Sequence, residues 1–212
     1  MDTTPIHIVD DDKSVRAGLA RLIKSAGLRP CVYESAEEFL NGVDAAEPAC
    51  LLLDIRMPGL NGLEVQERLN SNGLNMPIIF ITGHGTVPMS VEAMKEGAWD
   101  FIEKPFDDDV LLEAIQSAVA KASAEVDERD DLRRLRGLLH SLTPREFEIF
   151  RHVVSGMLNK QIAFKLEISE KTVKTHRGRV MEKMQTRALA DLVRIAAKLE
   201  IPLPSKEWLA LD

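Results

Sequence analysis

Three consecutive leucines, Leu51 to Leu53, are the feature that most constrains the fold of this 212-residue chain. An uninterrupted apolar run of this length is typical of a strand buried on both faces, as in a parallel sheet covered by helices. Asp54 follows the run directly, and Pro58-Gly59 turns the chain shortly afterwards. Because ligands bind at the carboxyl ends of strands in open α/β sheets, Asp54 is placed for chemistry rather than for packing.

Four further segments among residues 1–122 have strand character and alternate with helical patterns. These predicted strands are Ile6–Val9, Arg29–Tyr33, Pro77–Thr82 and Asp100–Glu103. We expect Ser14 to cap the first helix, and Ser35 to Glu38 to form a capping box for the second. Strands that alternate with helices are joined by right-handed crossovers. The sequence therefore predicts an α/β domain with a doubly wound, five-stranded parallel sheet.

A helical pattern begins at Asp107 and continues far beyond the predicted sheet. Residues 120–140 contain no proline, and their first glycine is Gly137. This composition favours a stiff helical linker over residues 123–140. The apolar spacing changes register at Arg129, which leaves open whether the linker pairs with a second chain as a short coiled coil.

Residues 141–200 have the pattern of a second, all-helical domain. Thr143-Pro144-Arg145-Glu146 combines a hydroxyl N-cap, a proline at the first helical position and a glutamate at the third. The tight connection Glu167-Ile168 joins the second and third of four predicted helices, and the third helix is basic, which indicates a helix-turn-helix. The three later helices are predicted at Asn159–Leu166, Ser169–Met184 and Ala188–Leu199.

The net charge of −7 hides a division along the chain. Residues 1–122 contain 20 acidic and 10 basic residues, whereas residues 141–212 contain 9 acidic and 13 basic residues. This division suggests a cation or phosphate site in the first half and a nucleic-acid surface in the second. A random scatter of surface charge is the alternative before any motif is considered.

The cysteine and apolar content bears on the compartment. Cys31 and Cys50 lie in apolar, strand-like settings, which favours buried thiols over a disulfide. No apolar run approaches the roughly 20 residues of a membrane span, and the polar N-terminus is not a signal peptide. We therefore expect a cytoplasmic protein that makes no membrane contact.

Polar side chains at the ends of the predicted strands form a candidate phosphoryl site. Asp10, Asp11 and Asp54 should converge at one edge of the sheet, and a cluster of hard oxygen ligands suits Mg²⁺. Lys104 would add a positive charge and Thr82 a hydroxyl, so that nucleophile, metal, lysine and hydroxyl would surround a phosphoryl group. Each residue alone has a structural alternative: the aspartate as a turn residue, Lys-Pro as a strand end, the threonine as a cap.

Residues 4–122 resemble the flavodoxin-like receiver domain of bacterial two-component response regulators. The matching motifs are Asp10-Asp11, Leu53-Asp54, Met57-Pro58-Gly59 with Gly62, Thr82-Gly83 and Lys104-Pro105. The resemblance implies that Asp54 accepts a phosphoryl group from a histidine kinase. It also implies that Mg²⁺ is bound by Asp11, Asp54 and the backbone carbonyl of Arg56, with Asp10 acting through water.

The same resemblance implies a conformational switch beside the phosphoacceptor. Thr82 and Phe101 would be the switch pair, in which the hydroxyl moves to the phosphate and the ring turns inward. Lys104 would contact the phosphate, and the Lys104–Pro105 bond would be cis, which is inexpensive only before proline. Such a receiver assists its own phosphorylation and dephosphorylation and is not otherwise an enzyme.

Residues 142–199 resemble the four-helix DNA-binding domain of the NarL/LuxR family, and the whole chain resembles the FixJ subfamily. The matching motifs are Thr143–Glu146, Asn159–Ala163 and Thr172–His176, together with Thr82–Gly85 and Val87–Met89 for the subfamily. On the basic helix, Val173, Val180 and Met184 are spaced to pack inward. Gly178 would face the groove of the DNA without a side chain to contact a base.

The helix-turn-helix implies double-stranded DNA as a partner. Lys174 and Thr175 are the candidate base contacts. Solvation of an exposed helix is the alternative for the charged residues, above all for Lys183. The remaining candidate DNA contacts, mostly to phosphate, are Lys160, Thr172, Arg177, Arg179 and Lys183.

These observations predict a transcription regulator in which phosphorylation of Asp54 drives homodimerisation and DNA binding, with RNA polymerase as a further candidate partner. The expected domains are a receiver (1–122), a helical linker (123–140), a DNA-binding domain (141–200) and a tail (201–212) of unassigned function. A phosphatase-like hydrolase is a competing class, but its second catalytic aspartate is replaced here by Arg56. A scaffold receiver is another, but it would not need a cluster of mutually repelling carboxylates.

Overall fold

The computed structural model describes residues 4–43, 49–74, 76–83 and 85–204. The chain divides into two compact units, Met1–Val126 and Asp127–Asp212, which we call the N-terminal and C-terminal units. The boundary falls inside helix α5 (Asp108–His140), which is continuous through Arg129, where the apolar spacing changes register. No helix among the described residues is long and apolar enough to cross a membrane.

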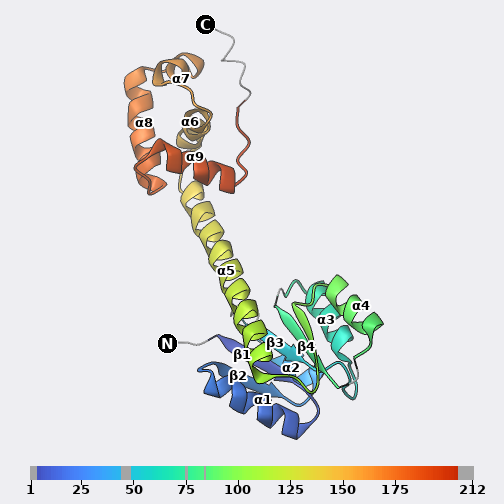
Figure 1. Ribbon diagram of the computed structural model, residues 1–212. Coiled ribbons are helices and arrows are strands. Elements are labelled where there is room, and N and C mark those ends of the chain that lie inside the picture. Colours follow the sequence, from blue (N-terminus) through green and yellow to red (C-terminus); the bar gives the residue numbers. More distant parts are fainter. Residues whose placement is uncertain (1–3, 44–48, 75, 84, 205–212) are drawn as a thin grey trace. The chain divides into compact units, whose positions relative to one another are not determined.

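The N-terminal unit is built around the predicted five-stranded parallel sheet (Figure 1). The pairing order is β2-β1-β3-β4-β5, and all four pairings are parallel. The order reverses between β1 and β3, so the carboxyl ends of these strands flank the switch point at which ligands bind in such sheets. The strands are β1 (Pro5–Val9), β2 (Arg29–Tyr33), β3 (Cys50–Leu53), β4 (Ile78–Thr82) and β5 (Asp100–Glu103).

Helices cover both faces of this sheet, which explains why its central strands β1, β3 and β4 are buried along their whole length and mostly apolar. One core cluster joins the sheet to α1 (Lys13–Ser25) and to the first part of α5, through Leu19, Ile23, Leu111 and Ile115. The other core cluster joins the opposite face to α2 (Ala36–Gly42), α3 (Gly62–Ser71) and α4 (Val87–Lys95), through Phe39, Val65, Leu69 and Ala93.

Two predicted helix caps differ from those found. Asp12, not Ser14, caps α1, because its carboxylate accepts hydrogen bonds from the backbone N–H groups of Ser14 and Val15. Ser35 caps α2 as predicted, but the capping box does not close. The carboxylate of Glu38 accepts from the N–H of Glu34 instead of that of Ser35.

The C-terminal unit contains the four predicted helices, α6 (Pro144–Val154), α7 (Asn159–Lys165), α8 (Glu170–Lys183) and α9 (Leu189–Lys198). Thr143 and Glu146 form the predicted capping box at the start of α6. Glu167, with a φ of 54°, turns the chain between α7 and α8. The helices share one core, which includes Phe150, Ile162, Val173, Val180 and Leu192.

Candidate functional site

The three aspartates of the predicted site meet at the carboxyl edge of the sheet. Asp10 follows β1 and Asp54 follows β3, and the N–H of Asp54 donates to the carbonyl of Val9 at 2.9 Å, which aligns the two strand ends. Asp10, Asp11 and Asp54 each offer an oxygen, and these oxygens lie within 4.8 Å of one another. Asp10 is buried, Asp54 is half-buried and Asp11 is exposed, so the cluster opens toward solvent on one side.

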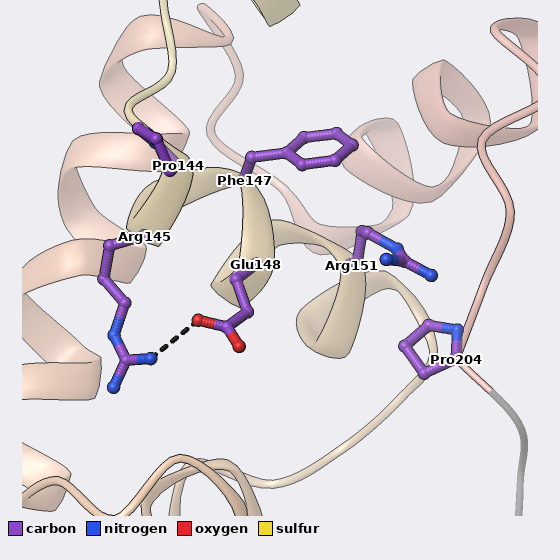
Figure 2. A pocket seen from close by; sticks show the side chains of 6 residues that line it. All are labelled: Pro144, Arg145, Phe147, Glu148, Arg151 and Pro204. Atoms are coloured by element: carbon purple, nitrogen blue, oxygen red, sulfur yellow. Dashed lines mark hydrogen bonds and ion pairs between the residues drawn. The ribbon is translucent and has the colours of Figure 1, made fainter.

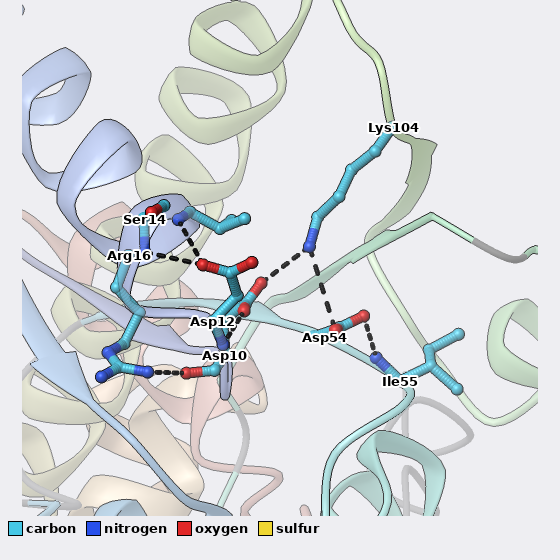
Figure 3. Close-up of polar contacts among 8 residues, drawn as sticks. Asp10, Asp12, Ser14, Arg16, Asp54, Ile55 and Lys104 are labelled. Atoms are coloured by element: carbon cyan, nitrogen blue, oxygen red, sulfur yellow. Dashed lines mark hydrogen bonds and ion pairs between the residues drawn. The ribbon is translucent and has the colours of Figure 1, made fainter.

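Lys104 supplies the positive charge nearest to this cluster (Figure 3). Its Nζ lies 2.7 Å from Oδ2 of Asp10 and 3.9 Å from Oδ2 of Asp54. The lysine follows β5, and its backbone N–H donates to the carbonyl of Thr82 at the end of β4. The Lys104–Pro105 bond is cis, as the resemblance predicted.

Asp54 ionises less readily than an ordinary aspartate. Partial burial is the main cause of its raised pKa, and the neighbouring Asp10 charge acts in the same direction. Lys104 and the backbone N–H groups of Arg56 and Ile55 act against this rise. The N–H of Ile55 donates to Oδ1 at 2.8 Å, whereas Oδ2 is the oxygen that faces Lys104. The carboxylate is therefore held in one orientation, with Oδ2 directed toward the cation.

Arg16 is a residue of the site that the sequence interpretation missed. Its Nη1 donates to the backbone carbonyl of Asp10 at 2.5 Å (Figure 3). Its Nη2 lies 3.8 Å from the carboxylate of Glu34. The N–H of Asp12 donates to Oδ1 of Asp10 at 2.8 Å. Asp10 is thus fixed through its backbone by Arg16, and through its two carboxylate oxygens by Asp12 and Lys104. The sequence does show an arginine about one turn into the helix that follows the aspartates, and its position is the feature that could have indicated this role.

Gly62 allows the chain to pass close behind Asp54. A Cβ at position 62 would lie 2.5 Å from the backbone oxygen of Asp54 and 3.1 Å from the ring of Phe80. Any side chain here would push α3 away from the loop that carries the phosphoacceptor candidate. Arg56 lies in the same loop with an exposed side chain.

The predicted switch residues lie on the two strands next to the cluster. Thr82 is buried at the end of β4, and Phe101 is half-buried in β5 with its ring centroid 6.4 Å from that of Phe80. His84, in the loop after β4, lies outside the described residues, as does Trp208 of the tail.

The basic helix α8 presents two different faces. Val173, Val180 and Met184 are buried, which confirms that these residues pack inward. Lys174 and Arg179 are exposed on the other side, and the space around Gly178 is open. Lys160 is likewise exposed in the first turn of α7.

Three candidate DNA contacts have hydrogen-bond partners within the C-terminal unit. Arg177 donates to Oδ1 of Asn159 at 3.1 Å and so links α8 to α7. The hydroxyl of Thr172 shares a 2.8 Å hydrogen bond with Ser169, and that of Thr175 donates to the carbonyl of Lys171. These polar atoms stabilise the helix-turn-helix itself.

Lys183, another candidate phosphate contact, forms an ion pair inside the C-terminal unit. Its Nζ donates to Oε2 of Glu146 at 2.6 Å and to the carbonyl of Ser141 at 2.9 Å. Glu146 is 2% exposed, and the Lys183 hydrogen bond, helped by the N–H of Thr143, lowers the pKa of its carboxyl to about 2. The ammonium is therefore paired with a buried carboxylate, which gives Lys183 a structural role within the C-terminal unit.

A shallow hollow on α6 is lined by Arg145 and Arg151 (Figure 2). Both arginines are already bonded to protein oxygens. Arg145 pairs with Glu148 at 2.6 Å and donates to the carbonyl of Leu166 after α7. Arg151 donates to the carbonyl of Pro202. These contacts hold α7 and the segment after α9 against α6.

Comparisons with known proteins identify both units. Residues 6–116 match the family described as response regulator receiver domain, and residues 140–196 match the family described as bacterial regulatory proteins, luxR family. The chain belongs to the LuxR-type response regulators. It is therefore a DNA-binding transcription regulator of two-component systems, and its family is regulatory rather than enzymatic.

Relatives of this response regulator match it over most of its length. The response regulator protein TmoT of Ectopseudomonas mendocina is 45% identical over 92% of this chain and 89% of its own. The transcriptional regulatory protein FixJ of Rhizobium meliloti is 45% identical over 90% of this chain and 94% of its own. Among solved structures, that of the response regulator StyR is 42% identical with a TM-score of 0.86, covering 92% of this chain and 99% of that one. The predicted kinship with FixJ is confirmed.

Proposed function

We propose that Asp54 accepts a phosphoryl group from a histidine kinase and thereby controls DNA binding. The observation that carries this proposal is the position of Asp54 Oδ2, which faces Lys104 at 3.9 Å in a half-buried carboxylate cluster. This oxygen attacks the phosphorus of a phosphohistidine, so a P–O bond forms while the P–N bond breaks and the imidazole leaves. Lys104 balances negative charge on the transferred group, and Thr82, at the end of β4, is the proposed hydroxyl that moves to the phosphate.

The donor set fits a magnesium ion. Three carboxylates that each bring an oxygen within 4.8 Å of the others are hard ligands that repel one another unless a cation lies among them. We propose that Asp11, Asp54 and the Arg56 carbonyl hold Mg²⁺, with Asp10 acting through water. When bound, the ion supplies additional neutralisation of the phosphoryl oxygens.

The kinase is proposed to dock beside Lys104. A hollow between α1 and the start of α5 is lined by Lys104 together with the apolar side chains Val15, Leu19, Leu22 and Phe106. An apolar helix face of the kinase can bury this surface while its phosphohistidine reaches the carboxylate cluster. We propose that the protein works in the cytoplasm, because both its proposed kinase contact and its DNA target require it there.

Phosphorylation is proposed to promote a homodimer through the α4–β5 face. Helix α4 exposes Val87, Val91 and Met94, whose exposed fractions are 77%, 46% and 47%. Thr82 and Phe101 lie on the strands next to this helix, so their rearrangement can change its surface. Two DNA-binding units then bind a roughly two-fold symmetric site, and RNA polymerase is the proposed next partner in transcription.

DNA contact is proposed for the exposed face of α8 and the first turn of α7. Lys174 and Thr175 are the proposed base contacts, and Lys160 and Arg179 the proposed phosphate contacts. Thr172 and Arg177, also candidate DNA contacts, are proposed to act as positioning residues, because their side chains bond to the side chains of Ser169 and Asn159, whereas the Thr175 hydroxyl bonds to a backbone carbonyl of its own helix and can still accept a hydrogen bond from a base. The excess of basic over acidic residues in 141–212 favours binding to DNA phosphates, which weakens as the salt concentration rises.

Phosphoryl transfer is tested directly with radiolabelled acetyl phosphate and Mg²⁺. Wild-type protein should incorporate label, whereas Asp54→Asn should not. Asp12→Asn is the matched control, because asparagine also caps helices well and the carboxylate of Asp12 is used for that purpose. Equal labelling of wild type and Asp54→Asn would refute the assignment of the phosphoacceptor.

A further inference from the structure

The chain after α9 returns to α6 before the described residues end. Glu200, with a φ of 52°, turns the chain, and Ile201 packs against the core of the C-terminal unit. Nε of Arg151 then donates to the carbonyl of Pro202 at 2.9 Å. Pro204, the last described residue, is half-buried and lines the hollow on α6. The chain is therefore led to this hollow at the point where the tail begins.

The lining of the hollow suits an aromatic side chain (Figure 2). The volume of the hollow is about 490 Å³, within the usual range of sites that bind small organic groups. The ring of Phe147 lines it and stacks on Phe150, with the centroids 6.1 Å and the planes 17° apart. Arg145 and Glu148 also line it, and their charges balance each other in an ion pair. An aromatic occupant can therefore stack on Phe147 without leaving a charge uncompensated.

The tail carries such a side chain within reach. Residues 205–212 read Ser-Lys-Glu-Trp-Leu-Ala-Leu-Asp, and their aromatic residue is Trp208. Four residues of extended chain span at most about 14 Å, so Trp208 can reach the hollow that Pro204 already lines. The match to the luxR family covers residues 140–196, and the tail lies outside the matched domain.

We propose that the tail docks on its own C-terminal unit, with the indole of Trp208 in the hollow on α6. The indole stacks on Phe147 and contacts the guanidinium of Arg151, as aromatic rings and planar cations do. Its N–H donates to the carboxylate of Glu148, whose two oxygens have lone pairs beyond those used by Arg145. The tail thereby extends the core of this unit and holds the segment after α9 against α6. The inference does not rest on phosphoryl transfer or on the proposed DNA contacts.

Tryptophan fluorescence of the full chain tests the docking, because Trp99 is the other tryptophan of the sequence and Trp99→Phe leaves Trp208 as the reporter. In this background Trp208 should emit at a shorter wavelength, and should be quenched less by acrylamide, than in the urea-unfolded chain. Phe147→Ala should shift the emission to that of the unfolded chain. Phe164→Ala, at a side chain of α7 that is 87% exposed, is the matched control and should leave it unchanged. A fully solvated Trp208 in the Trp99→Phe background, or equal shifts in the two phenylalanine variants, would overturn the proposal.

A truncation cycle gives a readout that does not depend on how well Phe147→Ala folds. Removal of residues 205–212 should lower the thermal midpoint of the C-terminal unit. Phe147→Ala should then lower the midpoint less in the truncated chain than in the full chain, because its contact with the tail is already lost. Phe164→Ala should act equally in both. An unchanged midpoint after truncation, or equal losses for Phe147→Ala in the two chains, would contradict the docking.

Dilution separates docking within one chain from docking between two copies. The emission of Trp208 in the Trp99→Phe background should be independent of protein concentration. A shift to longer wavelength on dilution would show that the tail binds a second copy, and would overturn its assignment to its own C-terminal unit.

Discussion

The ammonium of Lys183, in the last turn of α8, lies 2.6 Å from the carboxylate of Glu146, 37 positions earlier in the first turn of α6. The same ammonium donates to the carbonyl of Ser141, which follows α5 directly. Lys183 therefore links α8, the start of α6 and the end of α5. We infer that Lys183 holds the DNA-binding unit together.

Lys183→Met should destabilise the C-terminal unit. Removal of one partner from a buried ion pair leaves the other charge uncompensated, at a cost of about 3–5 kcal/mol when both are fully buried. Because the Lys183 side chain is 34% exposed, we expect a loss of about 2 kcal/mol. Urea unfolding measures it, with the exposed Lys174→Met as the control. Equal losses in the two variants would contradict the role given to Lys183.

Glu146 should make the stability of the C-terminal unit depend on pH in the acidic range. Its pKa is lowered from 4.5 to about 2 in the folded state, so folding favours the ionised form. The resulting stability is complete above pH 4.5 and is lost as the pH falls toward 2. Glu146→Gln should therefore be less stable at pH 6 and should lose less between pH 5 and pH 3. Urea midpoints across this range decide it, and parallel curves would argue against the pair.

Arg16→Met should weaken the binding of Mg²⁺. Arg16 fixes the backbone of Asp10 from behind, and loss of a group that orients a metal ligand typically costs about 10–100-fold in affinity. We expect about a tenfold loss in calorimetric titrations with Mg²⁺. Arg21→Met, on the exposed side of the same helix, is the matched control. An unchanged affinity in Arg16→Met would exclude this positioning role.

Lys174→Ala and Arg179→Ala should separate base contacts from phosphate contacts. Lys174→Ala should weaken binding to a specific DNA site, obtained by selection, by about 1–3 kcal/mol and leave non-specific binding almost unchanged. Arg179→Ala should weaken both kinds of binding alike and reduce the slope of log K against log salt by about 1. Fluorescence anisotropy at several salt concentrations measures both quantities. A loss of specificity in Arg179→Ala alone would reverse the two assignments.

Local patterns predicted most of the fold. The apolar runs at Leu51 to Leu53 and at β4 predict buried strands because each run is too short for a helix and lacks the polar alternation of a half-exposed strand. Thr143 and Glu146 predict the start of α6 because a capping box is a contact between residues three apart. The prediction that Ser14 caps α1 was wrong, because Asp12, two residues earlier, has a carboxylate that accepts hydrogen bonds from two backbone N–H groups.

Contacts between residues far apart in the chain were beyond these patterns. A lysine on a basic helix is predicted to contact DNA. Nothing near Lys183 in the sequence indicates that the buried carboxylate of Glu146 lies beside it. The sequence places Gly85 in a loop, and nothing near it in the chain indicates that an added Cβ would lie 2.9 Å from the ring of Phe101. The carboxylates and Lys104 are the exception, because parallel strands bring their carboxyl ends together wherever they lie in the sequence.

The central claim is that phosphorylation of Asp54 drives assembly, and sedimentation velocity tests it most directly. Wild-type protein and Asp54→Asn are compared in Mg²⁺, before and after acetyl phosphate. We predict that the wild type changes from monomer to dimer on addition of acetyl phosphate and that Asp54→Asn remains a monomer. A dimer that is already complete without acetyl phosphate, or that Asp54→Asn forms equally well, would contradict the account.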